Sequence, residues 1–239
     1  MSAAFPPSRL RDVKIRLATP NDISKITTLI DRSVRNLQKS YYTPDQIELA
    51  LEHVYGVDSQ LISDSTYFVI TRSFPTGGEE HVDGGDEIEG GRRVGHLGEQ
   101  DDEILACGGW SFRSTLYGGD QFSGRAPPSL LNPLTDAARI RAFFVDPNLA
   151  KSGLGSMIYG RCEEDAKSKG WKRFEVGATL SGVAFYEKMG FKGDQRADAV
   201  MGSGEICKYI VLEHSMFTVW AGGTRLSLTW PSSGNCQDE

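Results

Sequence analysis

The sequence predicts an α/β domain with a central mixed, mostly antiparallel sheet flanked by helices. Short β-rich runs recur along the chain, at 14–17, 140–145 and 206–212 among others. Two longer stretches, 23–37 and 153–169, carry apolar residues at helical spacing. The chain has 239 residues, of which 39% are hydrophobic and 24% charged, and these fractions are ordinary for a globular domain with a buried core.

The first half of the chain is expected to hold three strands and two helices. They are a strand at 14–17, a helix over 23–37, a helix from 44 to about 54, and antiparallel strands at 66–71 and 104–112. The run Pro20-Asn21-Asp22 is a helix-start signal for the first helix. Thr43 is a candidate cap for the second, because Pro44 favours the first turn of a helix.

The second half is expected to alternate strands with helices. The elements are strands at 140–145, 173–178 and 206–212, a helix over 153–169 and a short helix over 182–189. Asp146-Pro147 ends the first of these strands, and Gly170 and Gly190 end the two helices.

Two segments stand outside this pattern. Residues 75–102 are dense in glycine and acidic residues, which predicts a mobile surface insertion, with metal binding or substrate attraction as the alternative. The long loop at 117–135 is typical of a lid. We therefore expect one domain over 14–216, and a C-terminal extension over 217–239 that adds an edge strand or lies on the surface.

Composition excludes several functions. The 32 acidic residues outnumber the 26 basic ones, so we expect no binding to nucleic acid or to a membrane, whereas a mild attraction for cationic amines is permitted. The first thirteen residues lack the apolar core of a secretory signal, which favours a cytoplasmic or nuclear location. No metal is predicted, because Cys107, Cys162, Cys207 and Cys236 form no ligand pattern. The oligomeric state is left open between monomer and homodimer.

The segment 139–155 points to an anion site. A strand passes through Val145-Asp146-Pro147 into a turn with Gly153 and Gly155, and a helix follows at once. Free N–H groups and the helix dipole at such a helix start favour phosphate. A nucleotide hydrolase and a dinucleotide-binding dehydrogenase are excluded, because neither a Gly-Lys-Ser/Thr ending nor GxGxxG follows the strand.

Two motifs together resemble the GNAT superfamily of N-acetyltransferases. They are VDPxxxxxGxG at 145–155 and Phe185-Tyr186-Glu187-Lys188-Met189-Gly190-Phe191. The resemblance covers most of 14–216, outside the acidic insertion, and motifs such as Gly108-Gly109-Trp110 are similar to a subgroup without an assigned substrate. It implies the GNAT fold, with the sheet splayed between 140–145 and 173–178 to admit acetyl-CoA.

The resemblance also implies a set of cofactor-binding residues. The backbone of the strand would pair with pantetheine and the turn would hold the pyrophosphate: Phe143, Phe144 and Val145, then Lys151, Ser152, Gly153, Leu154, Gly155 and Ser156. The chain departs from the family at Ala150 and Lys151, where Arg or Gln followed by Gly is usual. A side-chain phosphate contact is lost at 150, and Lys151 is a candidate to replace its charge.

Catalysis requires a proton donor for the leaving thiolate, oxyanion stabilisation and a neutral amine. By resemblance Tyr186 is the general acid, with a packed aromatic beside Phe185 as the alternative, and backbone N–H groups of 143–145 stabilise the oxyanion. No base is assigned. Glu175 and Asp136 are candidate relays, and a solvated or salt-bridged role is favoured for both.

The acceptor side is expected to include aromatic and cationic residues. By analogy with the family, Tyr41, Tyr42 and Trp110 form an apolar or cation-π wall, with core packing as the alternative. Arg139 and Arg141 would bind a carboxylate or phosphate of the acceptor, or form structural ion pairs.

The predicted function is acetyl-CoA-dependent N-acetylation of a primary amine, either a small molecule or a peptide. The alternative is a noncatalytic acyl-CoA-binding sensor or scaffold, which the missing base favours. A third hypothesis is transfer to protein termini or lysines, with the acidic insertion attracting basic tails.

Overall fold

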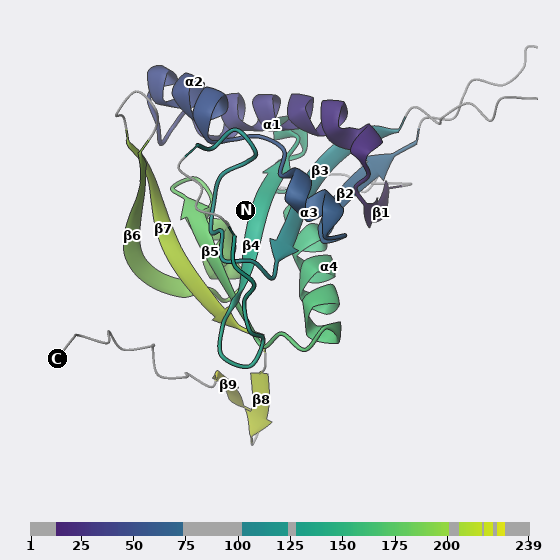
Figure 1. The fold of residues 1–239 in the computed structure, drawn as a ribbon, viewed down its shortest axis with the longest axis vertical. Helices are drawn as coiled ribbons and strands as arrows, with labels where there is room; N and C mark the ends of the chain where they lie inside the picture. Colours follow the sequence, from purple (N-terminus) through teal and green to yellow (C-terminus); the bar gives the residue numbers. More distant parts are fainter. Residues whose placement is uncertain are drawn as a thin grey trace, which may run out of the picture.

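A computed structural model describes residues 13–73, 102–123, 128–200, 206–216, 218–221 and 224–227 (Figure 1). Its centre is a seven-stranded sheet in the order β1-β2-β3-β4-β5-β7-β6. The strands are β1 Val13–Leu17, β2 Tyr67–Arg72, β3 Glu103–Ser111, β4 Ala138–Val145, β5 Arg173–Thr179, β6 Lys192–Val200 and β7 Ile206–Ser215. Only β4 and β5 pair in parallel, so the predicted mixed, mostly antiparallel sheet is confirmed.

The helices begin and end at local signals in the sequence. They are α1 Ile23–Leu37, α2 Pro44–His53, α3 Ser59–Ser63, α4 Leu154–Ser168 and α5 Val183–Lys188, with short 3₁₀ turns at Pro20–Asp22 and Pro147–Leu149. Thr43 caps α2 as predicted: the Gln46 N–H donates to its hydroxyl at 3.2 Å, and the Gln46 side chain accepts from the Thr43 N–H. Gly170, with φ of +85°, follows the end of α4.

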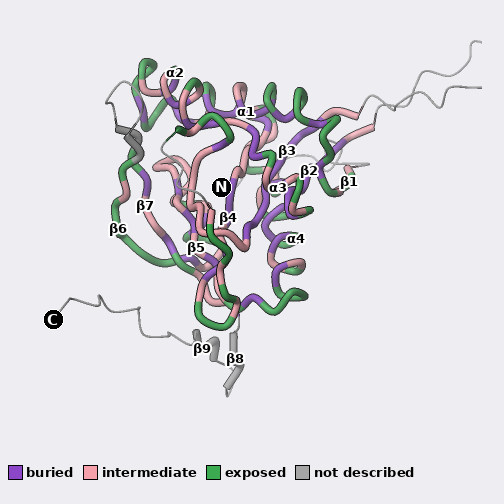
Figure 2. Tube along the Cα trace, in the orientation of Figure 1, coloured by how far each residue is buried: buried purple, intermediate pink, exposed green. Residues whose placement is uncertain are grey.

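Helices cover both faces of the sheet, and alternate residues of β2 show this directly. Tyr67 and Val69 belong to the core beneath α1 and α2, whereas Phe68 and Ile70 belong to the core beneath α4. Figure 2 shows that β2 and β3 are mostly buried and that β6 is mostly exposed. The predicted α/β class with flanking helices is therefore confirmed.

Several elements lie where the sequence did not predict them. The edge strand β6 and the short helix α3 were not expected. Within 217–239, β8 (Thr218–Ala221) and β9 (Thr224–Ser227) pair with each other as a separate two-stranded sheet and add no strand to the main one. Residues 74–101, nearly all of the expected acidic insertion, lie outside the described residues. Across the described ranges, no helix has the length and apolarity to cross a membrane.

The sheet parts between β4 and β5. The two strands pair only at Ala138↔Phe174, Arg139↔Glu175 and Ile140↔Val176. Past Ile140 and Val176 both strands continue, but they no longer pair. This confirms the predicted splay, and it exposes one backbone edge of β4 within the sheet.

Candidate active site

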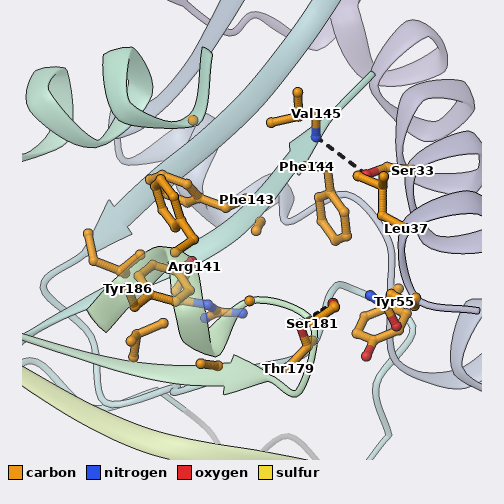
Figure 3. A pocket seen from close by; sticks show the side chains of 18 of the residues that line it. Ser33, Leu37, Tyr55, Arg141, Phe143, Phe144, Val145, Thr179, Ser181 and Tyr186 are labelled. Atoms are coloured by element: carbon orange, nitrogen blue, oxygen red, sulfur yellow. Dashed lines mark hydrogen bonds between the residues drawn. The ribbon is translucent and has the colours of Figure 1, made fainter. Parts of the chain in front are cut away.

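A cavity of about 860 Å³ occupies the opening between β4 and β5 (Figure 3). Its walls come from β4, β5, the start of α4 and α5. Residues of α1, of 54–56 and of 116–119 close it further, together with Tyr209 of β7. Segments distant in sequence therefore converge on the parted strands.

A bulge in β4 shapes one wall of the cavity. The register against β3 shifts between Cys107 and Gly109, and Ala142 has a φ of 55°, which is unusual for a residue other than glycine. After the bulge the side chains alternate again. Phe143 packs with the core beneath α4, and Phe144 packs with the core beneath α1.

The free edge of β4 carries backbone groups that need partners. The Val145 N–H donates to the hydroxyl of Ser33, a buried residue of α1, at 3.3 Å (Figure 3). Phe143, Phe144 and Val145 all line the cavity, where the sequence analysis expected them. A ligand that carries amide groups could pair with this edge as an added strand would.

Asp146 links the turn between β4 and α4 both to itself and to α1. Asp146, 4% exposed, accepts from the Asn148 N–H at 2.8 Å and pairs with Arg32 of α1 at 2.5 Å. Lys151 (φ 63°) and Gly153 (φ 102°) both adopt the left-handed conformation just before α4. These two left-handed residues turn the chain so that α4 begins at the next residue, Leu154.

The start of α4 faces the cavity. Lys151, Gly153, Leu154, Gly155 and Ser156 line it, and α4 is a fifteen-residue helix whose first N–H groups lack helical partners. Such groups, with a lysine beside them, are a candidate anion site. Ser152, also predicted as a ligand, is not in the wall, and its hydroxyl donates to the Leu149 carbonyl at 2.6 Å.

Tyr186 lies on α5, lines the cavity and is 7% exposed. Its ring centroid is 6.2 Å from that of Phe143, 5.0 Å from Phe185 and 5.4 Å from Phe191. Burial raises the pKa of Tyr186 above the ordinary phenol value, and nearby Cys162 adds to the effect. The hydroxyl is therefore protonated at neutral pH, as a proton donor must be.

Arg141 forms a buried ion pair. Its guanidinium lies 2.7 Å from Asp58, and the two side chains are 2% and 0% exposed. It also donates to the carbonyls of Thr115 and Gly118, in the loop that closes the cavity. Arg141 lines the cavity, but the structure favours the ion-pair reading of this residue over recognition of an acceptor carboxylate.

The two candidate relays have structural partners. Glu175 pairs with Arg139 across β4 and β5. Asp136 accepts from the Asn132 N–H at 2.7 Å and from the Thr135 hydroxyl at 3.3 Å. Neither lines the cavity; Glu175 matches the salt-bridged alternative, and Asp136 instead accepts hydrogen bonds within its own turn.

Of the three expected acceptor-side aromatics, only Tyr41 lines the cavity; it is 53% exposed. The Tyr42 hydroxyl instead donates to the Lys208 carbonyl and accepts from the Leu180 N–H, each at 2.9 Å. The expectation for Trp110 is wrong. Trp110 is fully buried in the core beneath α4, where its indole N–H donates to Asp165 at 2.8 Å.

Sequence reasoning missed the aromatic residues that do line this part of the cavity. Tyr117 and Tyr209 stack with centroids 4.8 Å apart and an interplanar angle of 7°. The rings of Tyr55 and Phe144 meet edge to face, with their centroids 6.2 Å apart. Tyr55 follows a helix and Tyr117 lies in a glycine-rich loop, so no periodic pattern marks either residue. Their position next to Gly56 and Gly118 was the available signal.

The charged side chains that the described residues contribute to the cavity wall are all cationic: Arg141, Lys151 and Lys188. In the same described ranges, no three His, Cys, Asp or Glu side chains are grouped to hold a metal ion.

Comparisons with known proteins agree with this geometry. A family model described as an acetyltransferase (GNAT) domain matches residues 130–203, which include β4, α4, β5 and α5. A solved structure described as the GCN5-related N-acetyltransferase "Aminotransferase, Class-II" from Rhodopseudomonas palustris matches with a TM-score of 0.53 at 14% identity. That match covers 85% of this chain and 96% of the other chain, and it shows a shared fold.

Two further structures are similar at lower scores. PaiA N-acetyltransferase from Thermoplasma acidophilum, in complex with coenzyme A, has a TM-score of 0.49 and 10% identity, covering 85% of this chain and 99% of its own. The ribosomal-protein-S18-alanine N-acetyltransferase from Escherichia coli has a TM-score of 0.45 and 12% identity, covering 88% and 97%. No curated protein matches. The chain therefore has the GNAT fold, and its residues 130–203 match the model of an acetyltransferase (GNAT) domain.

Proposed function

We propose that this protein transfers the acetyl group of acetyl-CoA to a primary amine. One observation carries the proposal: the free edge of β4, the anion site at the start of α4 and the protonated Tyr186 all face one cavity. An elongated ligand with amide groups and a diphosphate matches the first two features. The third feature, the Tyr186 phenol, can supply the proton that the departing thiolate needs.

The residues of the cavity fit such a ligand. Lys151 and the first N–H groups of α4 would hold the diphosphate, and the charge of Lys151 would serve where Ala150 offers no side-chain contact. The edge of β4 past Ile140 would pair with the amides of the pantetheine arm. Gly155 leaves room for the ring of Phe185, because a Cβ there would lie 3.3 Å from that ring.

The transfer step then needs charge stabilisation and a proton. Backbone N–H groups of β4 beside the bulge would stabilise the negative charge that develops on the thioester oxygen. Tyr186 would donate its proton to the sulfur as the carbon–sulfur bond breaks. Phe143, Phe185 and Phe191 hold the phenol in place, so the aromatic packing and the acid role are compatible.

Binding of acetyl-CoA by calorimetry, followed by thiol release with a panel of amines, tests the proposal. Tyr186→Phe should retain binding and lose about 10²- to 10⁴-fold in kcat. Tyr159→Phe is the matched control, because Tyr159 is also a buried tyrosine of the core beneath α4 but does not line the cavity. Full kcat in Tyr186→Phe would refute the acid role. Binding without thiol release from any amine would identify an acyl-CoA sensor instead.

A further inference from the structure

Resting on the proposed function, we infer that the acceptor is an arylamine, a weakly basic amine attached directly to a planar aromatic ring. The inference depends on two features of the cavity. One is the set of aromatic side chains away from the anion site, and the other is the sign of the charged groups in the wall.

The aromatic wall consists of Tyr41, Tyr55, Tyr117, Phe144 and Tyr209, all of which line the cavity. Phe144 directs its side chain to the α1 side of β4, away from Phe143 and Tyr186, so the wall adjoins the free edge on the face opposite the acid. Tyr55 and Phe144 meet edge to face at 6.2 Å, and Tyr117 and Tyr209 stack at 4.8 Å. A flat ring extends such an arrangement by offset or edge contacts.

The charges of the cavity disfavour an ammonium group. The charged side chains of the described wall are Arg141, Lys151 and Lys188, and the charge of Arg141 is balanced by Asp58. A cation that enters must lose water and can gain cation–π contacts with the rings but no carboxylate from the described wall, so its desolvation is only partly compensated. An amine that is already neutral at physiological pH avoids the penalty.

Because an arylamine is neutral at physiological pH, it can also react without first losing a proton. The nitrogen lone pair of a neutral arylamine attacks the thioester carbon, the C–N bond forms and the C–S bond breaks. The thiolate takes the proton of Tyr186, and the proton released by nitrogen restores the phenol, so one amide and one thiol are produced. An alkylamine must first lose a proton; with a pKa of about 10, only roughly 10⁻³ of it is neutral at pH 7. Glu175 and Asp136, the nearest candidates for that step in the sequence, are engaged elsewhere.

Three acceptors separate basicity from ring shape: aniline is aromatic and weakly basic, benzylamine is aromatic and basic, and cyclohexylamine is basic without an aromatic ring. Thiol release should give aniline the highest kcat/KM at pH 7, and the value should stay constant to about pH 8.5. The value for benzylamine should rise about tenfold per pH unit, following its neutral fraction. A dipeptide with a free α-amine completes the panel.

The wall is tested at Tyr41, which is half exposed, so its replacement should leave the fold intact. Tyr41→Leu should raise KM for aniline about threefold to tenfold, and Tyr41→Phe, which keeps the ring, should restore it. Acetyl-CoA binding should be unchanged in both variants.

The outcomes are distinguishable. If acetyl-CoA does not bind, or no acceptor releases thiol, the proposed function fails and the acceptor inference fails with it. If acetyl-CoA binds and benzylamine, cyclohexylamine or the dipeptide equals aniline at pH 7, the transferase stands and the arylamine inference is overturned.

Discussion

The buried pair between Arg141 and Asp58 gives the sharpest stability prediction. Asp58→Asn keeps the shape of the side chain and removes its charge, leaving a guanidinium that is 2% exposed without its anion. Loss of one partner of a buried pair costs about 3–5 kcal/mol, a large part of the 5–15 kcal/mol typical of a domain. The free energy of unfolding should fall by about that amount in urea titrations, with the denaturant slope unchanged.

An exposed pair supplies the control. Glu164 lies 3.0 Å from Arg161, but the two side chains are 73% and 42% exposed, so Glu164→Gln should lower the free energy of unfolding by less than about 1 kcal/mol. If Asp58→Asn lowers the free energy of unfolding no more than Glu164→Gln does, the carbonyls of Thr115 and Gly118 are enough to stabilise the buried charge of Arg141. The reasoning from burial would then be wrong.

Three further predictions concern the cavity and the core. Gly153→Ala forces a residue with a Cβ to a φ of 102°, which should cost about 1–3 kcal/mol and weaken acetyl-CoA binding in calorimetry; unchanged affinity would exclude this turn as the diphosphate site. Because burial raises the pKa of Tyr186, the phenol stays protonated as pH rises through the ordinary value of about 10. kcat should therefore show no falling limb below that pH, and a loss of rate between pH 9 and 10 would contradict the assignment. Burial also raises the pKa of Cys107 to about 12, so peptide mapping should find it alkylated by iodoacetamide at pH 8 in urea but not in the native protein, and native labelling would argue against a closed core.

Local signals predicted much of this fold. The cap at Thr43, the glycine at 170 and the periodicity of α1 and α4 depend on residues within a few positions of each other. The proposed cofactor motif is local too, since the strand, the turn and the helix that form it are continuous over 138–168. For that reason the resemblance of these motifs to a family could assign Lys151, Gly153 and Phe143 to one site, and all three line the cavity.

Features that depend on distant pairing could not be predicted. Strand β6 has the polar sequence KGDQRADAV, which lacks strand propensity, and it is a strand because it pairs along β7. Trp110 was assigned to the wrong face because register shifts between β2, β3 and β4 decide which way its side chain points. Whether Tyr41 or Tyr42 reaches the cavity depends on the conformation of the α1–α2 connection, which neighbouring residues do not reveal.

The extra residue at Ala142 divides β4 into two segments: even-numbered residues face α4 before it, and odd-numbered residues face α4 after it. Before it, Ala138 and Ile140 face α4; after it, Phe143 and Val145 do. Deleting Ala142 would restore regular alternation and leave Phe143 and Phe144 on their present faces, but it would remove the bulge that bends β4 beside the cavity. Strand length at this point is therefore a functional constraint in its own right. An alignment with an unbulged strand must place its gap at the bulge, because a gap placed after Phe144 would assign Phe143 and Phe144 to the wrong faces of the sheet.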